Sequence, residues 1–174
     1  MEISRKELLR NGAAAAMAGT LPGLVGPIQD AGARATGPGH PQRPPAGEGL
    51  CLLSAIELRD LMRARRVSPV EVMEAHLARI ERLNPALNAF VALLPDTALA
   101  GARAAERRIM RGGARPLEGL PVAIKDLFDF LAGAPNTFGS VPMKQLGFTP
   151  DHSSIYVQRL IDAGAIPIGK TNTP

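Results

Sequence analysis

Serine and glutamate lie three residues apart at two places where an apolar helical repeat begins. The two pairs are Ser54–Glu57 and Ser68–Glu71. A serine that accepts a hydrogen bond from the first helical turn, with a glutamate that reaches back to it, forms a capping box. Behind each box, apolar residues recur every three or four positions. The sequence therefore predicts helices over residues 54–65 and 69–84, the second ending at Asn84-Pro85 because proline disfavours a helical residue before it.

Short apolar runs between turn-forming residues predict three strands. They lie at residues 88–94 (NAFVALL), 122–125 (VAIK) and 165–170 (AIPIGK). Each run is too short for a helix and is bounded by Gly, Pro or Asn, which is typical of buried strands.

Two more helices are expected among these strands. One is rich in Ala and Arg and starts with Asp96 or Thr97 as its capping residue; the other starts with Asp151 or Ser153. Between them, residues 130–150 have no period and are rich in Gly, Pro and Ser, so we expect a loop. Strands that alternate with helices predict an α/β fold with a largely parallel sheet.

Composition narrows the class of protein. Hydrophobic residues make up 45% of the 174 residues and charged residues 21%, with a net charge of +4, which is typical of a globular domain. Aromatic residues make up 3%, too few for the stacking platforms that bind single-stranded nucleic acid. A single cysteine, Cys51, excludes an internal disulfide and indicates a small buried apolar residue. The three histidines show no metal-ligand spacing, so we expect neither a metal nor a cofactor.

Residues 1–33 do not fit the folded pattern and have the layout of an export signal. A charged start with SRKELLR precedes a mildly apolar run, and small residues follow at 31–35. This order is typical of a signal peptide, and SRKELLR resembles a twin-arginine signal in which Lys6 replaces the second arginine. The alternative is an amphipathic N-terminal helix. Residues 34–49 are rich in Pro and Gly and predict a linker, so the folded part is expected to begin near Leu50.

Lys125 is the candidate catalytic residue. It follows the apolar run Val122 to Ile124, where the predicted strand leaves the core. Open α/β sheets usually build their sites at this edge. An ammonium held partly out of water has a lowered pKa, which would let a lysine act as a general base. The alternative is a lysine at a strand end that extends into water.

Several separated blocks between residue 50 and the end closely resemble the N-terminal part of the amidase signature family. The blocks are SAIELRDLMRARRVSPVEVMEAHLARIERLNPALNAFV (54–91), PLEGLPVAIKDLFD (116–129), TFGS (137–140), DHSS (151–154) and DAGAIPIGKTNTP (162–174). The resemblance does not extend to the leader, and residues 130–133 form a path into the loop that is one residue longer than usual. It implies the N-terminal portion of a mixed β-sheet covered by helices.

The resemblance also implies a function, the hydrolysis of a carboxylic amide through a Ser-cis-Ser-Lys triad. Lys125 matches the triad lysine, which takes a proton from the nucleophilic serine through the bridging serine. In the family both serines lie in a Gly/Ser-rich segment after the TNTP stretch. Ser140, Ser153 and Ser154 do not match them.

The resemblance therefore predicts that residues 50–174 are a truncated N-terminal piece of an exported amidase, inactive alone. Its partner would be a small-molecule amide; nucleic acid and stable membrane insertion are not expected, and a homo-oligomer is left open. The location would be periplasmic or secreted, or cytoplasmic if the leader is not recognised. Two alternatives are an amidotransferase subunit that acts on misacylated tRNA, which shares these motifs, and a non-catalytic remnant. An export leader conflicts with a cytoplasmic tRNA partner.

Overall fold

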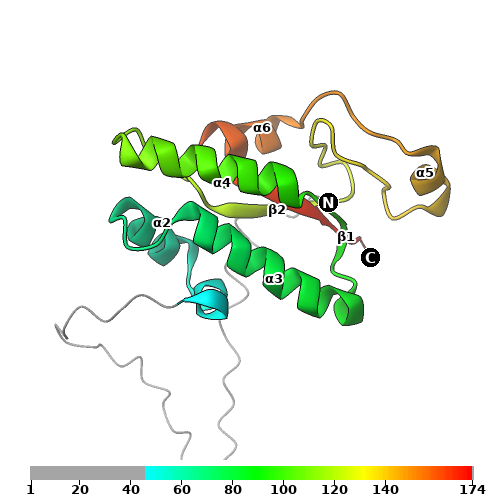
Figure 1. The fold of residues 1–174 in the computed structure, drawn as a ribbon. Helices are drawn as coiled ribbons and strands as arrows, with labels where there is room; N and C mark the ends of the chain where they lie inside the picture. Colours follow the sequence, from blue (N-terminus) through cyan, green and yellow to red (C-terminus); the bar gives the residue numbers. More distant parts are fainter. Residues whose placement is uncertain (1–45, 174) are drawn as a thin grey trace, which may run out of the picture. The chain divides into compact units, whose positions relative to one another are not determined.

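The computed structural model describes residues 46–173 (Figure 1). In chain order its elements are the 3-10 helix η1 (Gly47–Leu52), α2 (Ala55–Arg63), α3 (Pro69–Leu87), β1 (Phe90–Leu93), α4 (Pro95–Met110), β2 (Pro121–Lys125), α5 (Val141–Leu146), α6 (Ile155–Asp162) and β3 (Ile166–Thr171). The expected signal peptide, and the expected linker up to residue 45, lie outside the described residues. Residues 47–49, the end of that linker, belong to η1.

Both capping boxes form, and the first two long helices begin where the sequence predicts. The Ser54 hydroxyl accepts a bond from the Glu57 N–H at 3.2 Å, and the Glu57 carboxylate accepts one from the Ser54 N–H at 2.8 Å. Ser68 and Glu71 exchange the same two bonds at 3.1 and 2.8 Å. These bonds satisfy backbone donors that a helix start leaves without a partner.

The α3 helix continues past Asn84-Pro85 and ends at Leu87, so its expected end is wrong. Because Pro85 lies close to the last turn of α3, it removes only the one helical hydrogen bond that its missing N–H would have made. Asn88, with a left-handed φ of 50°, closes the helix through its N–H bond to the Asn84 carbonyl at 2.7 Å. The Asn84 side chain then exchanges two bonds with the Phe90 backbone, at 2.8 and 3.0 Å, and so ties the helix end to the start of β1.

The start of α4 also differs from the prediction. Its N-cap is Leu94, with Pro95 as the first helical residue, rather than Asp96 or Thr97. Proline suits this position because its φ is already helical and its missing N–H has no helical partner there. Asp96 lies in the first turn, where its negative charge interacts favourably with the helix dipole.

The region expected to be a loop contains a short helix, and the next helix starts later than expected. α5 (Val141–Leu146) lies inside residues 130–150 and ends at Gly147, which has a φ of 65°. α6 begins after Ser154 instead of Asp151 or Ser153. The Ser154 hydroxyl makes no capping bond, because it donates to the Phe128 carbonyl and accepts from the Phe130 N–H.

The three strands form a mixed sheet in the order β1-β3-β2. The central strand β3 is antiparallel to β1 and parallel to β2. The mixed sheet implied by the family resemblance is therefore confirmed, whereas the largely parallel sheet inferred from alternation is wrong for β1. The alternation of strands and helices does not fix the direction of β1 relative to β2 here, because the chain passes through the long connection 111–120 between α4 and β2.

Three clusters of buried apolar residues form the core, and two of them include strands of the sheet. Small residues of α4 pack on β3, and Gly101 of α4 comes so close that an added Cβ would lie 3.0 Å from Ile166. This first cluster consists of Met73, Ala98, Ala102, Ala105, Ile166 and Ile168. A second cluster joins β2 to α6 and to the loop after β2, and consists of Ile124, Leu131, Ala134 and Val157. A third cluster consists of residues from η1, α2, α3 and the end of α4, with Val67 and Leu120 from the connections.

Candidate active site

Lys125 is the last residue of β2, an outer strand of the described sheet. Its Cα pairs with that of Thr171, and the next residue, Asp126, continues the ladder by donating its N–H to the Thr171 carbonyl at 2.9 Å. The strand-end position predicted from the VAIK run is thus confirmed. The expected partial burial is not found among residues 46–173, because the Lys125 side chain is exposed there.

Asp126 ties the strand end to the far side of the following loop. Its side chain is 1% exposed, and its carboxylate accepts bonds from the Thr137 N–H at 2.9 Å and from the Thr137 hydroxyl. Bonds of this kind satisfy a buried carboxylate that would otherwise be costly to desolvate. The loop between Asp126 and Thr137 therefore returns to the residue beside Lys125.

Lys170, in the central strand, is fully buried. Its ammonium donates to the Asn136 side-chain oxygen at 2.6 Å and to the Asp129 carbonyl. Burial lowers the pKa of this ammonium, and the negative charges of Asp126 and Asp129 oppose that shift. The sequence shows Lys170 only as the last residue of the apolar run AIPIGK and does not report this network.

Four phenylalanines gather in the same region, which low aromatic content did not predict. Phe138 contacts Phe128 and Phe130 edge to face, with ring centroids 5.7 and 5.9 Å apart, and Phe148 packs against both Phe130 and Phe138. Phe128 stays 73% exposed. An apolar surface of aromatic rings therefore begins three residues after Lys125.

The serines near this region support the backbone. The Ser153 hydroxyl accepts a bond from the Ala132 N–H at 3.1 Å, and Ser154 bonds Phe128 and Phe130 as described above. Ser140 is the N-cap residue of α5. The hydroxyls of Ser153 and Ser154 therefore have structural roles in the loop after β2, whereas the Ser140 side chain makes no capping bond.

Other candidate groups add no chemistry to the site. Cys51 is half-buried against the third core cluster, and burial is the main cause that raises the pKa of its thiol, so the reactive thiolate is disfavoured. Within residues 46–173, no three His, Cys, Asp or Glu residues are grouped so that they could hold a metal ion. The described helices include none whose length and apolar character would let it cross a membrane.

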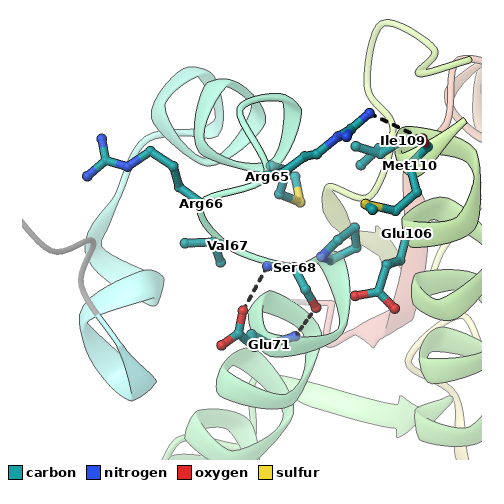
Figure 2. Close-up of a pocket in the computed structure, with 10 residues that line it drawn as sticks. Arg65, Arg66, Val67, Ser68, Glu71, Glu106, Ile109 and Met110 are labelled. Carbon is teal, nitrogen blue, oxygen red and sulfur yellow. Dashed lines mark hydrogen bonds between the residues drawn. The ribbon is translucent and has the colours of Figure 1, made fainter. Parts of the chain in front are cut away.

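A separate pocket of about 160 Å³ lies between the turn that joins α2 to α3 and the end of α4 (Figure 2). Arg65 reaches across it and donates to the Met110 carbonyl at 3.2 Å, while Glu71 is held by Ser68. Glu106 of α4 completes the charged lining. None of the lining residues comes from β2 or the loop after it, so this pocket is distinct from the Lys125 region.

A family model named Amidase matches residues 71–174, more than half of the chain. The A subunit of the glutamyl-tRNA(Gln) amidotransferase of Geobacter sulfurreducens is 46% identical over 121 residues, which is 69% of this chain and 24% of that protein. Its counterpart in Methylococcus capsulatus, which carries the same name, is 44% identical over 67% of this chain and 23% of its own length. The chain belongs to the amidase signature family, and it spans about a quarter of the length of these relatives.

Solved structures give the same assignment of fold. A bacterial aryl acylamidase of the amidase signature enzymes superposes with a TM-score of 0.65 at 35% identity, over 70% of this chain and 25% of that one. The peptide amidase of Stenotrophomonas maltophilia gives 0.66 at 32% identity, over 72% and 26%. The described residues are thus a partial amidase signature domain, with the α/β fold that the sequence predicts.

Proposed function

We propose that this chain is the N-terminal part of an amidase and that Lys125 is the base of its Ser-cis-Ser-Lys triad. The observation that carries the proposal is the position of Lys125, at the end of β2 and before a loop that is anchored on both sides. This position lies within the segment that matches the amidase family model. A base that must meet its proton donor in a fixed geometry needs such a rigid support.

The proposed chemistry is acyl transfer to serine. Lys125 takes the proton of the nucleophilic serine through the bridging serine, and the serine oxygen forms a bond with the amide carbonyl carbon. The C–N bond then breaks, the amine leaves with a proton returned from the lysine, and water hydrolyses the acyl-enzyme. The substrate is a small-molecule amide, and no metal or cofactor takes part.

Residues 1–174 alone are proposed to be inactive, because Ser140, Ser153 and Ser154 do not match the two serines of the family's triad, and the Ser153 and Ser154 hydroxyls already bind the loop backbone. Without the nucleophilic serine, the lysine has no group to deprotonate. Without the oxyanion donors, the negative charge that develops on the amide oxygen is not stabilised. Activity therefore has to be tested in a full-length amidase that contains this segment.

The decisive experiment compares three lysine variants of that full-length enzyme on an acetylated nitroaniline. Lys125→Ala should reduce kcat by roughly three or more powers of ten, because loss of one member of a catalytic unit disables the unit. Lys125→Arg should fail almost as badly, since a guanidinium stays protonated near neutral pH. Lys144→Ala, at an exposed position of α5, is the matched control and should keep full activity. If folded Lys125→Arg enzyme kept most of its activity, the assignment of Lys125 would be wrong.

A second candidate function is supported by the relatives with the highest identities quoted above. Both are named as subunits of a glutamyl-tRNA(Gln) amidotransferase, so this chain could be part of a subunit that supplies ammonia to a tRNA-linked reaction. We favour the amidase because residues 1–33 have the layout of an export signal and a tRNA partner is cytoplasmic. A periplasmic or secreted location is therefore part of the proposal.

A further inference from the structure

The three lysines within residues 46–173 differ sharply in exposure. Lys125 and Lys144 are exposed, whereas Lys170 is fully buried. An ammonium loses a large hydration free energy on burial, which hydrogen bonds and opposite charges must offset. The groups that offset the lost hydration of the Lys170 ammonium therefore indicate the structural role of its burial.

Within residues 46–173, the two hydrogen-bond partners of the Lys170 ammonium lie in the loop directly after Lys125. It donates to the Asp129 carbonyl and, at 2.6 Å, to the Asn136 side-chain oxygen. The Asn136 side chain in turn donates to the Leu127 carbonyl at 2.8 Å. One ammonium thus joins the start of the loop to its end.

The strand that carries Lys170 also holds the residue next to Lys125. The Cα of Lys170 pairs with that of Ile124, and the carbonyl of Thr171 accepts the Asp126 N–H at 2.9 Å. Asp126 reaches Thr137 across the loop, as described above. Lys125 therefore sits between two residues whose positions depend on β3 and on the closed loop.

We propose that Lys170 is a positioning residue for Lys125. Its buried ammonium closes the loop of residues 127–136 and so fixes the direction in which Lys125 leaves the sheet. The inference rests on the proposed role of Lys125 as the base. Direction matters because a misplacement of about 1 Å can cost a factor of order a hundred in rate.

Hydrogen exchange of the 174-residue chain tests the loop without any need for activity. Lys170→Met keeps most of the side-chain volume and removes the donors, so amides of Phe130, Asn136 and Thr137 should exchange at least about tenfold faster. Amides within α4 should change by less than about twofold. Lys144→Met, the same change at an exposed position, should leave all of them unaltered. An unchanged loop, or equal acceleration in α4, overturns the inference.

Kinetics of the full-length enzyme test whether the closed loop serves catalysis. Lys170→Met should lower kcat by about 10- to 100-fold and leave KM within about threefold, because positioning of a base acts on the transition state. Asn136→Ala should give a similar loss, and the double variant should lose no more than the stronger single variant. Additive losses, or a change in KM alone, would show that Lys170 acts in another way.

These outcomes separate this inference from the proposed function. An active Lys125→Ala enzyme would overturn both, because no base would then need to be positioned. An inactive Lys125→Ala enzyme together with an unaffected Lys170→Met enzyme would overturn only the role of Lys170.

Discussion

The carboxylate of Glu118 is buried between two arginines just before β2, with its side chain 2% exposed. Arg115 binds it through two hydrogen bonds, at 2.6 and 3.0 Å, and Arg108 lies 3.3 Å away. Arg115 also donates to the Ile161 carbonyl at 3.2 Å, so this ion pair links the segment before β2 to α6. Burial alone would raise the pKa of Glu118, but the bonds and charges of Arg115 and the charge of Arg108 hold it below its usual value.

Glu118→Gln should therefore destabilise the fold at neutral pH by about 1 to 3 kcal/mol, since a buried charge-assisted bond is lost and Arg115 loses its partner. A carboxyl group with a lowered folded-state pKa contributes its full stability above the unfolded pKa of about 4.3, and this is lost as pH falls through the folded value. The deficit of the variant should consequently shrink in acid. Urea unfolding at neutral and acidic pH measures it.

The control for this prediction is Glu74→Gln, at an exposed position of α3. It should shift the unfolding midpoint little at either pH, because exposed charges contribute little to stability. A Glu118→Gln deficit of equal size at both pH values would contradict the account of the ion pair.

Strand β3 explains why the sequence locates Lys125 at a strand end but does not reveal the burial of Lys170. Simple alternation puts Lys170 on the same face as Ile166 and Ile168, which pack against α4. The pairing of β3 with β2 shifts register between Val122 and Ala123, and Lys170 then pairs with Ile124 and reaches the loop on the other side. A bulge of this kind redirects side chains, and no local sequence period reports it.

Gly169 allows this close pairing of β3 with β1. A Cβ at Gly169 would lie 2.4 Å from the Ala92 carbonyl oxygen, a backbone atom that moves only with its strand. Gly169→Ala should therefore cost about 2 to 3 kcal/mol. Gly113→Ala is the matched control, since its added Cβ would meet only ordinary contacts at 3.5 Å or more. Thermal unfolding followed by circular dichroism compares them, and equal melting temperatures would contradict the predicted clash.

Elements governed by local bonds were predicted better than those governed by tertiary contacts. The capping boxes at Ser54 and Ser68 act within one turn, so the sequence alone locates both helix starts. Ser154 could not be recognised as the N-cap of α6, because its hydroxyl is committed to the loop after β2. In the same way, the network around Lys170 joins residues more than thirty positions apart in sequence.

The chain spans about a quarter of the length of its relatives, and its described residues expose several large apolar side chains. Exposed apolar side chains lie on and around the loop after β2, including Phe128 at 73% and Leu146 at 76% exposure. The two candidate functions share this fold, and we propose that they differ in compartment. Residues 1–33, which lie outside the described residues, therefore carry the information that separates them.

We expect the protein to be exported and its leader to be cleaved. Small residues at 31–35 provide cleavage sites, so mass spectrometry of protein from its own host should find a mature N-terminus near Arg34 or Thr36 in the periplasmic or secreted fraction. Lys6→Arg restores the second arginine of the signal and should increase the exported fraction, whereas Arg5→Lys removes the remaining arginine of the pair and should reduce it. Both changes conserve charge, so a difference between them reports recognition of the signal and not the net charge of the leader. A chain that keeps an intact Met1 or Glu2 start and stays in the cytoplasm would favour the tRNA-linked amidotransferase instead.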